Sequence, residues 1–510
     1  MTPQKASTRV QRKHFTVEPG DPLNSWTRLI ADRPPSPLLL GCIASALIAL
    51  GSFGAGAVRY KGGILRALNL EFFSFGHGAS ISNCILWAGL ILFVFAWCVA
   101  GLRLATINLQ RTLVAWVAPL LFAAPILSRD VYSYLMQGAM LRDGFNPYRE
   151  GAAINPGAYL LEVSHDWRNT TTPYGPLHLW IGEGVTRIAG ENVTVGVILY
   201  KVISVIGFLL IAWSVPRIAQ AIGGNPQLAL WLGVLNPVVI FHMVGGMHNE
   251  SLVVGLVNVG ILWATRKHPG WIIAAVAIIS VSVSLKASAV IALPFVVWMA
   301  TNCLHERWGI HRAASFFASG FVLAAETLGI VALVTKLSGA SWEWISQVTG
   351  NSKVIDPLAA PSLIAGLITP FGRLVDPSFS YNALLDGIRT ITSILMLLGL
   401  VIAWWVFRSG TRRNVMGTVA AYGSLMVFNS VTLPWYYASP TTLIGTFTPP
   451  RWLVRFTIAA SITVGLAFAG SGNHHLYNGW IMVPLICISI VIATVLERAL
   501  SRQYACRRTT

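Results

Sequence analysis

An aspartate stands directly after a long apolar stretch, in the sequence SRDVYSY at residues 128–134. The residues before it, 113–127, are apolar enough to enter a bilayer. A carboxylate where such a segment emerges is costly unless it meets water, a partner or a substrate. One interpretation is an interfacial pair of Arg129 and Asp130 that only ends a helix. The other is a functional site, which the following residues favour.

From 129 to about 176 the chain is polar and aromatic, too short for a domain and too long for a plain connector. A loop of this kind on a rigid helical scaffold is where sites tend to be built. We therefore predict that substrate contacts come from this outer loop. The candidates are Tyr132, Tyr134, Asp143, Asn146, Tyr148, Asp166 and Tyr174.

A second polar group, His248-Asn249-Glu250, lies between two apolar segments and follows two glycines. A polar cluster at a helix start can bind an anion through His248 and free backbone N–H groups. The alternative is an N-cap by Asn249 with Glu250 in the first turn, and the two interpretations are compatible. Asn249 and Glu250 are also predicted to contact substrate.

Lys286 lies in a hairpin whose two arms are short, so its ammonium group must lie at or just inside the outer interface. A lone cation there favours an anionic ligand. Snorkelling to lipid headgroups is the alternative. The lysine faces the side on which the acidic and aromatic loops gather, which favours the ligand.

Aromatic side chains crowd the same face, among them Trp435 and Tyr436, which we predict to contact substrate. Rings with a polar tip suit both an interfacial belt and stacking on sugars, and most of these rings are predicted to form a belt. His474-His475 lacks a carboxylate at ligand spacing, so no metal site is predicted. No cofactor is predicted, and a divalent metal is compatible with the chemistry but not indicated.

The composition is that of a polytopic membrane protein: of 510 residues, 55% are hydrophobic and 11% charged. The net charge of +17 is explained by membrane topology and by contact with anionic lipid headgroups, and does not indicate nucleic-acid binding. The six cysteines have no metal-like spacing, so disulfides and zinc are not expected. The first 36 residues are polar and basic, and the apolar segment after them is predicted to be an uncleaved first span.

An all-α fold of about 14 (12 to 14) membrane spans follows, at about 20 apolar residues each. Segments 174–190 and 360–375 are too interrupted and are predicted to lie at the interface. Lys and Arg in alternate loops predict that both termini are cytoplasmic and that the residues named above share the outer face, with Arg59, Lys61 and Arg66 as exceptions. The predicted spans are 37–57, 82–102, 109–127, 193–215, 227–242, 250–265, 270–284, 287–302, 313–335, 383–407, 415–429, 436–448, 453–469 and 478–496.

Several motifs together resemble the actinobacterial polyprenol-phosphate-mannose-dependent α-1,6-mannopyranosyltransferases of the C-type glycosyltransferase superfamily. The resemblance runs from the first span to nearly the last and is closer to the subfamily that elongates the distal lipomannan backbone. The motifs are SRDVYSY with Gln137-Gly138, RDGFNPY at 142–148, YGP at 174–176, LNP at 235–237, GMHNE at 246–250, Lys286-Ala287 and LPWYY at 433–437.

The resemblance implies transfer of mannose, with inversion, from a polyprenyl-phosphate donor to a lipid-anchored mannan acceptor, as in lipomannan and lipoarabinomannan synthesis. It implies a bacterial plasma-membrane enzyme with an extracytoplasmic active site. Asp130 matches the superfamily's catalytic carboxylate and would act as the base. Arg129, Lys286 and His248 would neutralise the departing phosphate. The usual acidic pair is a single Asp here, so Asp143, Asp166 and Glu250 are candidates for a second carboxylate.

The predicted organisation is a basic cytoplasmic segment (1–36), two extra N-terminal spans (37–108), a transferase core (109–335) with the outer loop 129–176, a C-terminal bundle (336–496) and a basic cytoplasmic tail (497–510). Two alternatives stay open: a transporter or flippase of lipid-linked sugars, and a related transferase for another polyprenyl-phosphate sugar. The one-sided polar cluster argues against transport. The oligomeric state is not predicted.

Overall fold

The computed structural model describes residues 36–350 and 354–508, and within these ranges the chain is helical. A lone bridge between Phe468 and His474 is the single β-type pairing among the described residues. The predicted all-α fold is confirmed. The basic segment predicted over 1–36 lies outside the described residues except for its last residue.

The N-terminal half runs through helices of very different lengths. In chain order they are α2 (Pro37–Ala55), α3 (Ile64–Ala67), η1 (Glu71–Ser74), α4 (Gly76–Leu102), α5 (Leu109–Leu120), α6 (Asp130–Arg142), η2 (Ala152–Ile154), α7 (Ala158–Glu162), η3 (His165–Trp167), α8 (Pro176–Ala189), α9 (Val193–Ala221), α10 (Pro226–Ala229), η4 (Leu230–Val234), α11 (Pro237–Val239) and η5 (Ile240–Gly245).

The rest of the chain continues the bundle. Its helices are α12 (Glu250–Ala264), α13 (Pro269–Leu285), η6 (Ala287–Ala292), α14 (Leu293–Trp308), α15 (Arg312–Leu337), α16 (Trp344–Gly350), α17 (Ala360–Val375), α18 (Tyr381–Val406), α19 (Thr411–Phe428), η8 (Pro434–Tyr437), α20 (Ala438–Ile444), α21 (Arg451–Gly465) and α22 (Gly479–Arg508).

The predicted count of fourteen spans is not supported. Seven described helices are long and apolar enough to cross a membrane, and the bent pair over 226–245 makes an eighth if it counts as one span. The helices stand close to where they were predicted, but several are too short to span. Helix α12 has 15 residues, α13 has 17 and α5 has 12, against the roughly 20 that a bilayer requires.

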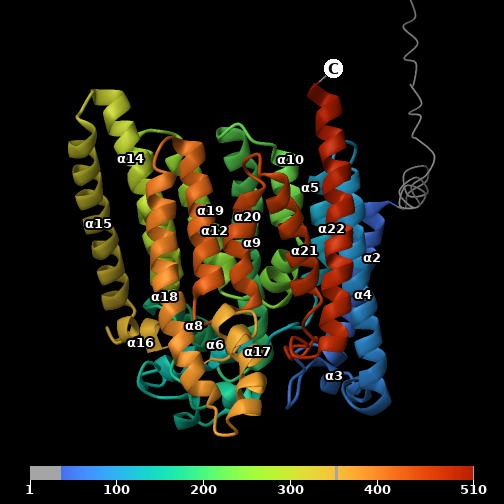
Figure 1. Ribbon diagram of the computed structural model, residues 1–510. Coiled ribbons are helices and arrows are strands. Elements are labelled where there is room, and N and C mark those ends of the chain that lie inside the picture. The colour runs from blue at the N-terminus through green and yellow to red at the C-terminus, as the bar shows by residue number, and fades with distance from the viewer. Residues whose placement is uncertain (1–35, 351–353, 509–510) are drawn as a thin grey trace, which may run out of the picture.

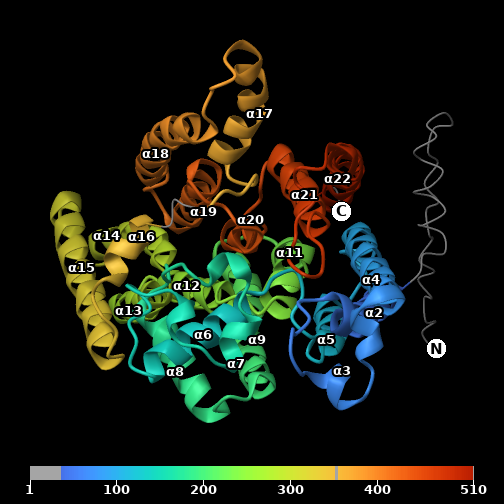
Figure 2. The same ribbon diagram turned by 90° about the horizontal axis from the view of Figure 1, so that it is seen from below.

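Long helices form an upright bundle, and short ones gather at one end of it (Figure 1). Helices α6, α8, α16 and α17 lie at the lower end, where α8 and α17 occupy the two segments predicted to be interfacial. Seen from below, α6 and α8 cover α9, while α15 stands at one edge of the bundle and α4 at the other (Figure 2). Helix α22 packs beside α4, so the C-terminal part closes on the N-terminal hairpin.

The centre of the bundle is the broken pair η4 and η5, whose helices meet at 52°. The break lies at Asn236-Pro237, where proline cannot donate a backbone hydrogen bond. The Asn236 side chain caps the second half by accepting from Val238 N and donates to Ser461 Oγ. The pair is buried along its length, and Trp231 stacks on Trp97 at 4.9 Å. This rigid element ends directly before His248.

Near His248, a buried lysine caps the C-terminal ends of two helices. Lys201 of α9 donates to the carbonyls of Leu120, at the end of α5, and Val244, in η5, at 3.3 and 2.8 Å. Cations stabilise helix C-termini because the carbonyls there lack helical partners. The contact ties the end of α5 to η5. In the segment that follows, the Pro125 carbonyl accepts the Ala57 backbone N–H at 2.8 Å.

Candidate active site

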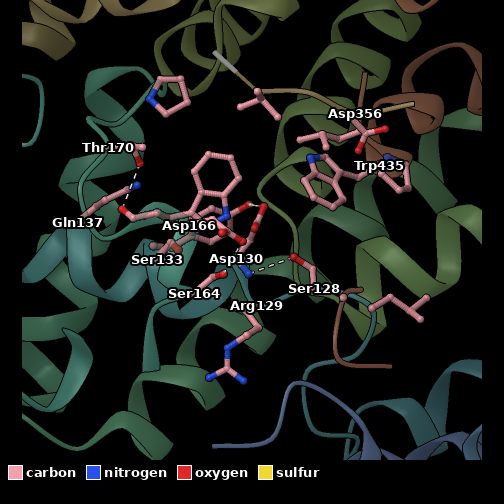
Figure 3. Close-up of a pocket in the computed structure, with 18 of the residues that line it drawn as sticks. Ser128, Arg129, Asp130, Ser133, Gln137, Ser164, Asp166, Thr170, Asp356 and Trp435 are labelled. Atoms are coloured by element: carbon pink, nitrogen blue, oxygen red, sulfur yellow. Dashed lines mark hydrogen bonds between the residues drawn. The ribbon is translucent and has the colours of Figure 1, made fainter. Parts of the chain in front are cut away.

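A cavity of about 1840 Å³ opens at the lower end of the bundle, between the segment around the end of α2, the outer loop and four C-terminal segments. Figure 3 shows its floor, with Asp130 at the start of α6 and Trp435 facing it from η8. Its polar and aromatic lining includes Arg59, Tyr60, Arg129, Asp130, Tyr134, Gln137, Tyr148, Arg149, Asp166, Trp167, Tyr174, Glu343, Gln347, Asp356, Trp435, Tyr436 and His474.

Asp130 begins helix α6, so the interpretation in which the pair of Arg129 and Asp130 only ends a helix is wrong. Ser128 Oγ accepts the Asp130 backbone N–H at 3.1 Å, which closes the first turn of α6. A carboxylate in the first helical turn is stabilised by the helix dipole. The side chain is 15% exposed, faces the cavity, and accepts a hydrogen bond from Tyr134 Oη at 3.4 Å.

His248 lies directly behind this carboxylate. Its Nδ1 is 3.5 Å from Asp130 Oδ2, and its ring is fully buried. The ring stacks on Trp435 at 3.6 Å with an interplanar angle of 20°. We predicted that His248 would meet the donor phosphate, but its nearest charged neighbour is Asp130. The stack fixes the imidazole, so the geometry favours a role in orienting Asp130.

Lys286 is largely buried, with 12% of its side chain exposed, and is paired with Glu250, so the lysine predicted to be alone has an ionic partner. Its Nζ also lies 4.0 Å from the centre of the Tyr436 ring and 5.4 Å from that of Tyr174. Both rings line the cavity. The ammonium group therefore sits directly behind an aromatic wall, at a position from which its field reaches the cavity.

A polar cluster supports the same wall from α8. His178 is hydrogen-bonded to Gln137 at 3.2 Å and to Asn249 at 3.3 Å, and its ring lies against Tyr134 and Tyr174. Burial lowers the pKa of His178 to about 3, so its imidazole is neutral. Asn249 was predicted to contact substrate, but it reaches His178 and makes no side-chain cap to α12.

Arg129 turns away from Asp130, as Figure 3 shows. Its guanidinium donates to the carbonyls of Val58 and Glu162 and lies 4.1 Å from the Tyr60 ring. Its three nitrogens are all engaged in this way. Arg129 thus links the segment after α2 to Glu162, beside the active site. These contacts occupy its guanidinium, so the predicted contact with the donor phosphate is not its main contact.

The remaining predicted residues divide into two groups. Tyr148, Asp166 and Tyr174 line the cavity, as does Tyr134. Asp143 pairs with Arg142 outside the cavity, and that guanidinium lowers the pKa of its carboxyl. The remaining two have structural contacts, since the Tyr132 hydroxyl donates to Ala57 O and Asn146 donates to Glu343.

Three carboxylates near the site were not predicted from the sequence. Glu162 is buried, ion-pairs with Arg59 and Arg129, and accepts the backbone N–H groups of Tyr60 and Lys61. Glu343 pairs with Arg149, which lowers the pKa of the carboxyl. Asp356 lines the wall around Trp435. Glu162 is the last residue of α7, and Glu343 and Asp356 lie in loops; no local sequence signal ties any of the three to the cavity.

No group of three or more His, Cys, Asp or Glu side chains placed to hold a metal ion occurs in the described part of the chain. The prediction of no metal site at His474-His475 stays a prediction.

Comparison with known proteins now assigns the class, that of membrane-embedded sugar transferases. Residues 38–302 match the family described as "Alpha-(1->6)-mannopyranosyltransferase, N-terminal domain", and residues 361–498 match "MptB C-terminal domain". The chain belongs to the α-(1→6)-mannopyranosyltransferase family and is a multi-pass membrane mannosyltransferase.

Relatives of known name support this assignment. The chain is 54% identical over 477 residues to "Alpha-(1->6)-mannopyranosyltransferase A" of Corynebacterium glutamicum, which covers 88% of this chain and 96% of the relative. It is 34% identical to the protein of the same name from Mycobacterium tuberculosis, covering 87% and 86%. Identity to "Alpha-(1->6)-mannopyranosyltransferase B" of C. glutamicum is 27%, covering 78% and 70%. The predicted family and its A-like subfamily are confirmed.

Proposed function

We propose that this enzyme transfers mannose from a polyprenyl-phosphate donor to a lipid-anchored mannan and so elongates the α-1,6 backbone of lipomannan. The observation that carries the proposal is Asp130, a carboxylate held at a helix start, backed by His248 and open to a large polar cavity. A single positioned base suffices where the leaving group is a phosphate.

In the proposed reaction, Asp130 takes the proton from the acceptor's 6-hydroxyl group as that oxygen attacks C1 of the donor mannose. The bond from C1 to the phosphate oxygen breaks, and the polyprenyl phosphate leaves with the electron pair. Attack opposite to the leaving group turns a β-linked donor into an α-linked product. The base is needed because an alcohol is a poor nucleophile until its proton is removed.

Stabilisation of the leaving phosphate falls to Lys286 in this proposal. Its charge lies behind the rings of Tyr174 and Tyr436 and is shared with Glu250. Arg129 and Arg59 share one carboxylate, Glu162, so the opposite side of the floor carries an excess positive charge. Phosphate binding beside these groups is electrostatically favourable.

The test of this function is a transfer assay with a purified donor. Membranes that contain the protein should transfer labelled mannose from polyprenyl-phosphate mannose to an α-1,6-mannoside acceptor, and membranes without it should not. Transport of the donor without formation of a glycosidic bond would favour the flippase instead. Transfer of another sugar at a higher rate would favour the related transferase.

We also propose that the cavity faces the extracytoplasmic side of the plasma membrane, with the loop between α18 and α19 in the cytoplasm. Arg408 in that loop and Arg412 and Arg413 in the first turn of α19 support this orientation. Single cysteines placed at 155 and 411, in a background without exposed cysteines, would report it through an impermeant reagent. Labelling at 411 in intact cells would overturn the orientation.

A further inference from the structure

The wall of the cavity around Trp435 carries polar groups that lack partners within the protein. Asp356 is 5% exposed, and among the described residues it forms no ion pair with Arg or Lys. Its Oδ1 accepts the Leu358 N–H at 2.8 Å, while Oδ2 has no hydrogen bond there and the residue lines the cavity. A carboxylate oxygen with free acceptor capacity at a cavity wall can accept a hydrogen bond from a ligand.

Two further groups on this wall are also unsatisfied. Trp435 Nε1 and His474 Nδ1 are buried and have no hydrogen-bond partner among the described residues, and both residues line the cavity. The three side chains come from separate segments: the stretch before α17, η8, and the loop between α21 and α22. In the view of Figure 3, Asp356 lies on the far side of Trp435 from Asp130.

The chemistry of Asp356, Trp435 and His474 disfavours a phosphate or a lipid chain as the ligand at this wall. Asp356 repels a phosphate, and a buried carboxylate disfavours a polyprenyl chain. The carboxylate of Asp356 accepts hydrogen bonds, and the imidazole of His474 and the indole N–H of Trp435 lie on the same wall. Such a set suits a neutral molecule with many hydroxyl groups, because each hydroxyl both donates and accepts. Burial raises the pKa of the Asp356 carboxyl, while the nearby His474 opposes that rise.

We infer that Asp356, His474 and Trp435 form a subsite for a mannosyl residue of the acceptor, the one preceding the residue whose hydroxyl Asp130 activates. This inference rests on the proposed function. The donor sugar is bonded to its phosphate and so belongs near Lys286, whereas the acceptor is a chain that continues away from the reacting carbon. A cavity of about 1840 Å³ is larger than the roughly 300 to 1,000 Å³ that suits a small ligand, so it has room for more than one sugar.

The test compares two synthetic acceptors, an octyl α-mannoside and an octyl α-1,6-dimannoside, with the purified full-length protein and a fixed donor. For Asp356→Asn, the KM for the dimannoside should rise about tenfold, the usual value of a charged hydrogen bond. The KM for the monomannoside, the KM for the donor and kcat should stay within about twofold. Asparagine keeps the oxygen that accepts from Leu358, so the loop should fold.

Matched variants separate this effect from a general disturbance. Asp386→Asn changes an exposed carboxylate on α18, where the side chain is 76% exposed, and should leave all constants unchanged. His474→Gln should act in the same direction as Asp356→Asn, whereas His475→Gln, at a residue outside the cavity lining, should not.

An unchanged dimannoside KM in both Asp356→Asn and His474→Gln would overturn the subsite, as would an equal rise for both acceptors or a rise confined to the donor. A parent enzyme that transfers mannose to neither acceptor would instead overturn the proposed function itself. The two failures are therefore distinguishable.

Discussion

Two walls of the same cavity differ in how their charges are satisfied. On the wall built by α12 and the hairpin after α13, Lys286 is paired with Glu250, and His248 contacts Asp130. On the wall around Trp435, Asp356 has no cationic side chain within ion-pair distance among the described Lys and Arg residues. The contrast lies in the ionic pairing alone, because buried polar atoms without a hydrogen-bond partner occur on both walls. Paired charges hold a fixed geometry, whereas a carboxylate that has no ionic partner and lines the cavity can gain one when a ligand binds.

The difference suggests a division of labour. The paired wall keeps the reacting groups rigid and in fixed orientation, which is what catalysis by positioned charges requires. The unpaired wall is suited to the repeated binding and release of sugar hydroxyl groups. We call the first the catalytic wall (Asp130, His248, Glu250 and Lys286) and the second the sugar wall (Asp356, Trp435 and His474).

The largest effect should come from Asp130 on the catalytic wall. Asp130→Asn keeps the size and some hydrogen bonding but removes the ability to take a proton, so mannosyl transfer should fall by about 10² to 10⁴-fold. The measurement is transfer of labelled mannose at equal amounts of membrane protein. Asp143→Asn, outside the cavity, is the control and should transfer at a rate close to that of the parent.

If the Asn variant at 130 keeps more than about a tenth of the activity, Asp130 is not the general base. Asp166 and Glu250 would then be the next candidates, since Asp166 lines the cavity and Glu250 lies behind it.

A large loss of stability should follow from breaking the buried pair. Glu250→Gln leaves the Lys286 ammonium buried without its counter-charge, which costs about 3 to 5 kcal/mol. The measurement is the midpoint of thermal unfolding of the purified protein in detergent. The double change Glu250→Gln with Lys286→Met removes both charges and should be less destabilising than Glu250→Gln alone. An equally unstable double variant would show that the pair is not the cause.

A smaller, kinetic effect should follow from removal of the cation alone. Lys286→Met should raise the donor KM by about tenfold and leave the acceptor KM nearly unchanged, because the phosphate belongs to the donor. Lys286→Arg keeps the charge and should recover most of the donor affinity. Equal donor dependence in the parent and in Lys286→Met would make the lysine structural only.

The smallest effect should come from His248, whose contact with Asp130 is long. His248→Gln should lower kcat by about fivefold, the value of a weak orienting interaction, without a change in donor KM. This outcome distinguishes orientation of Asp130 from the phosphate contact that the sequence suggested. A rise in donor KM with kcat preserved would restore the phosphate contact.

The sequence predicted the positions of most helices, but not how many of them span. Hydropathy marks α12 and α13 as apolar, yet their 15 and 17 residues fall short of a bilayer. It also cannot show that the segment over 226–245 bends at Asn236-Pro237 within the core. The segment 129–176 was predicted as a loop but begins with α6, whose 13 residues carry no strong apolar period.

For the site, Asp130, Tyr174 and Trp435 could be predicted because each stands in a distinctive motif on one face. Their partners could not. That Lys286 meets Glu250 and Arg129 meets Glu162 depends on how distant loops pack, and a single sequence carries no pairing information. Asp356 stands in an unremarkable loop, and only its burial beside Trp435 makes it a candidate.

The most direct test of the two-wall account is to determine the donor and acceptor KM values of Lys286→Met and Asp356→Asn side by side, with the dimannoside as acceptor. The account predicts a crossed result: Lys286→Met raises the donor KM alone, and Asp356→Asn raises the acceptor KM alone. The same KM rising in both variants would contradict it.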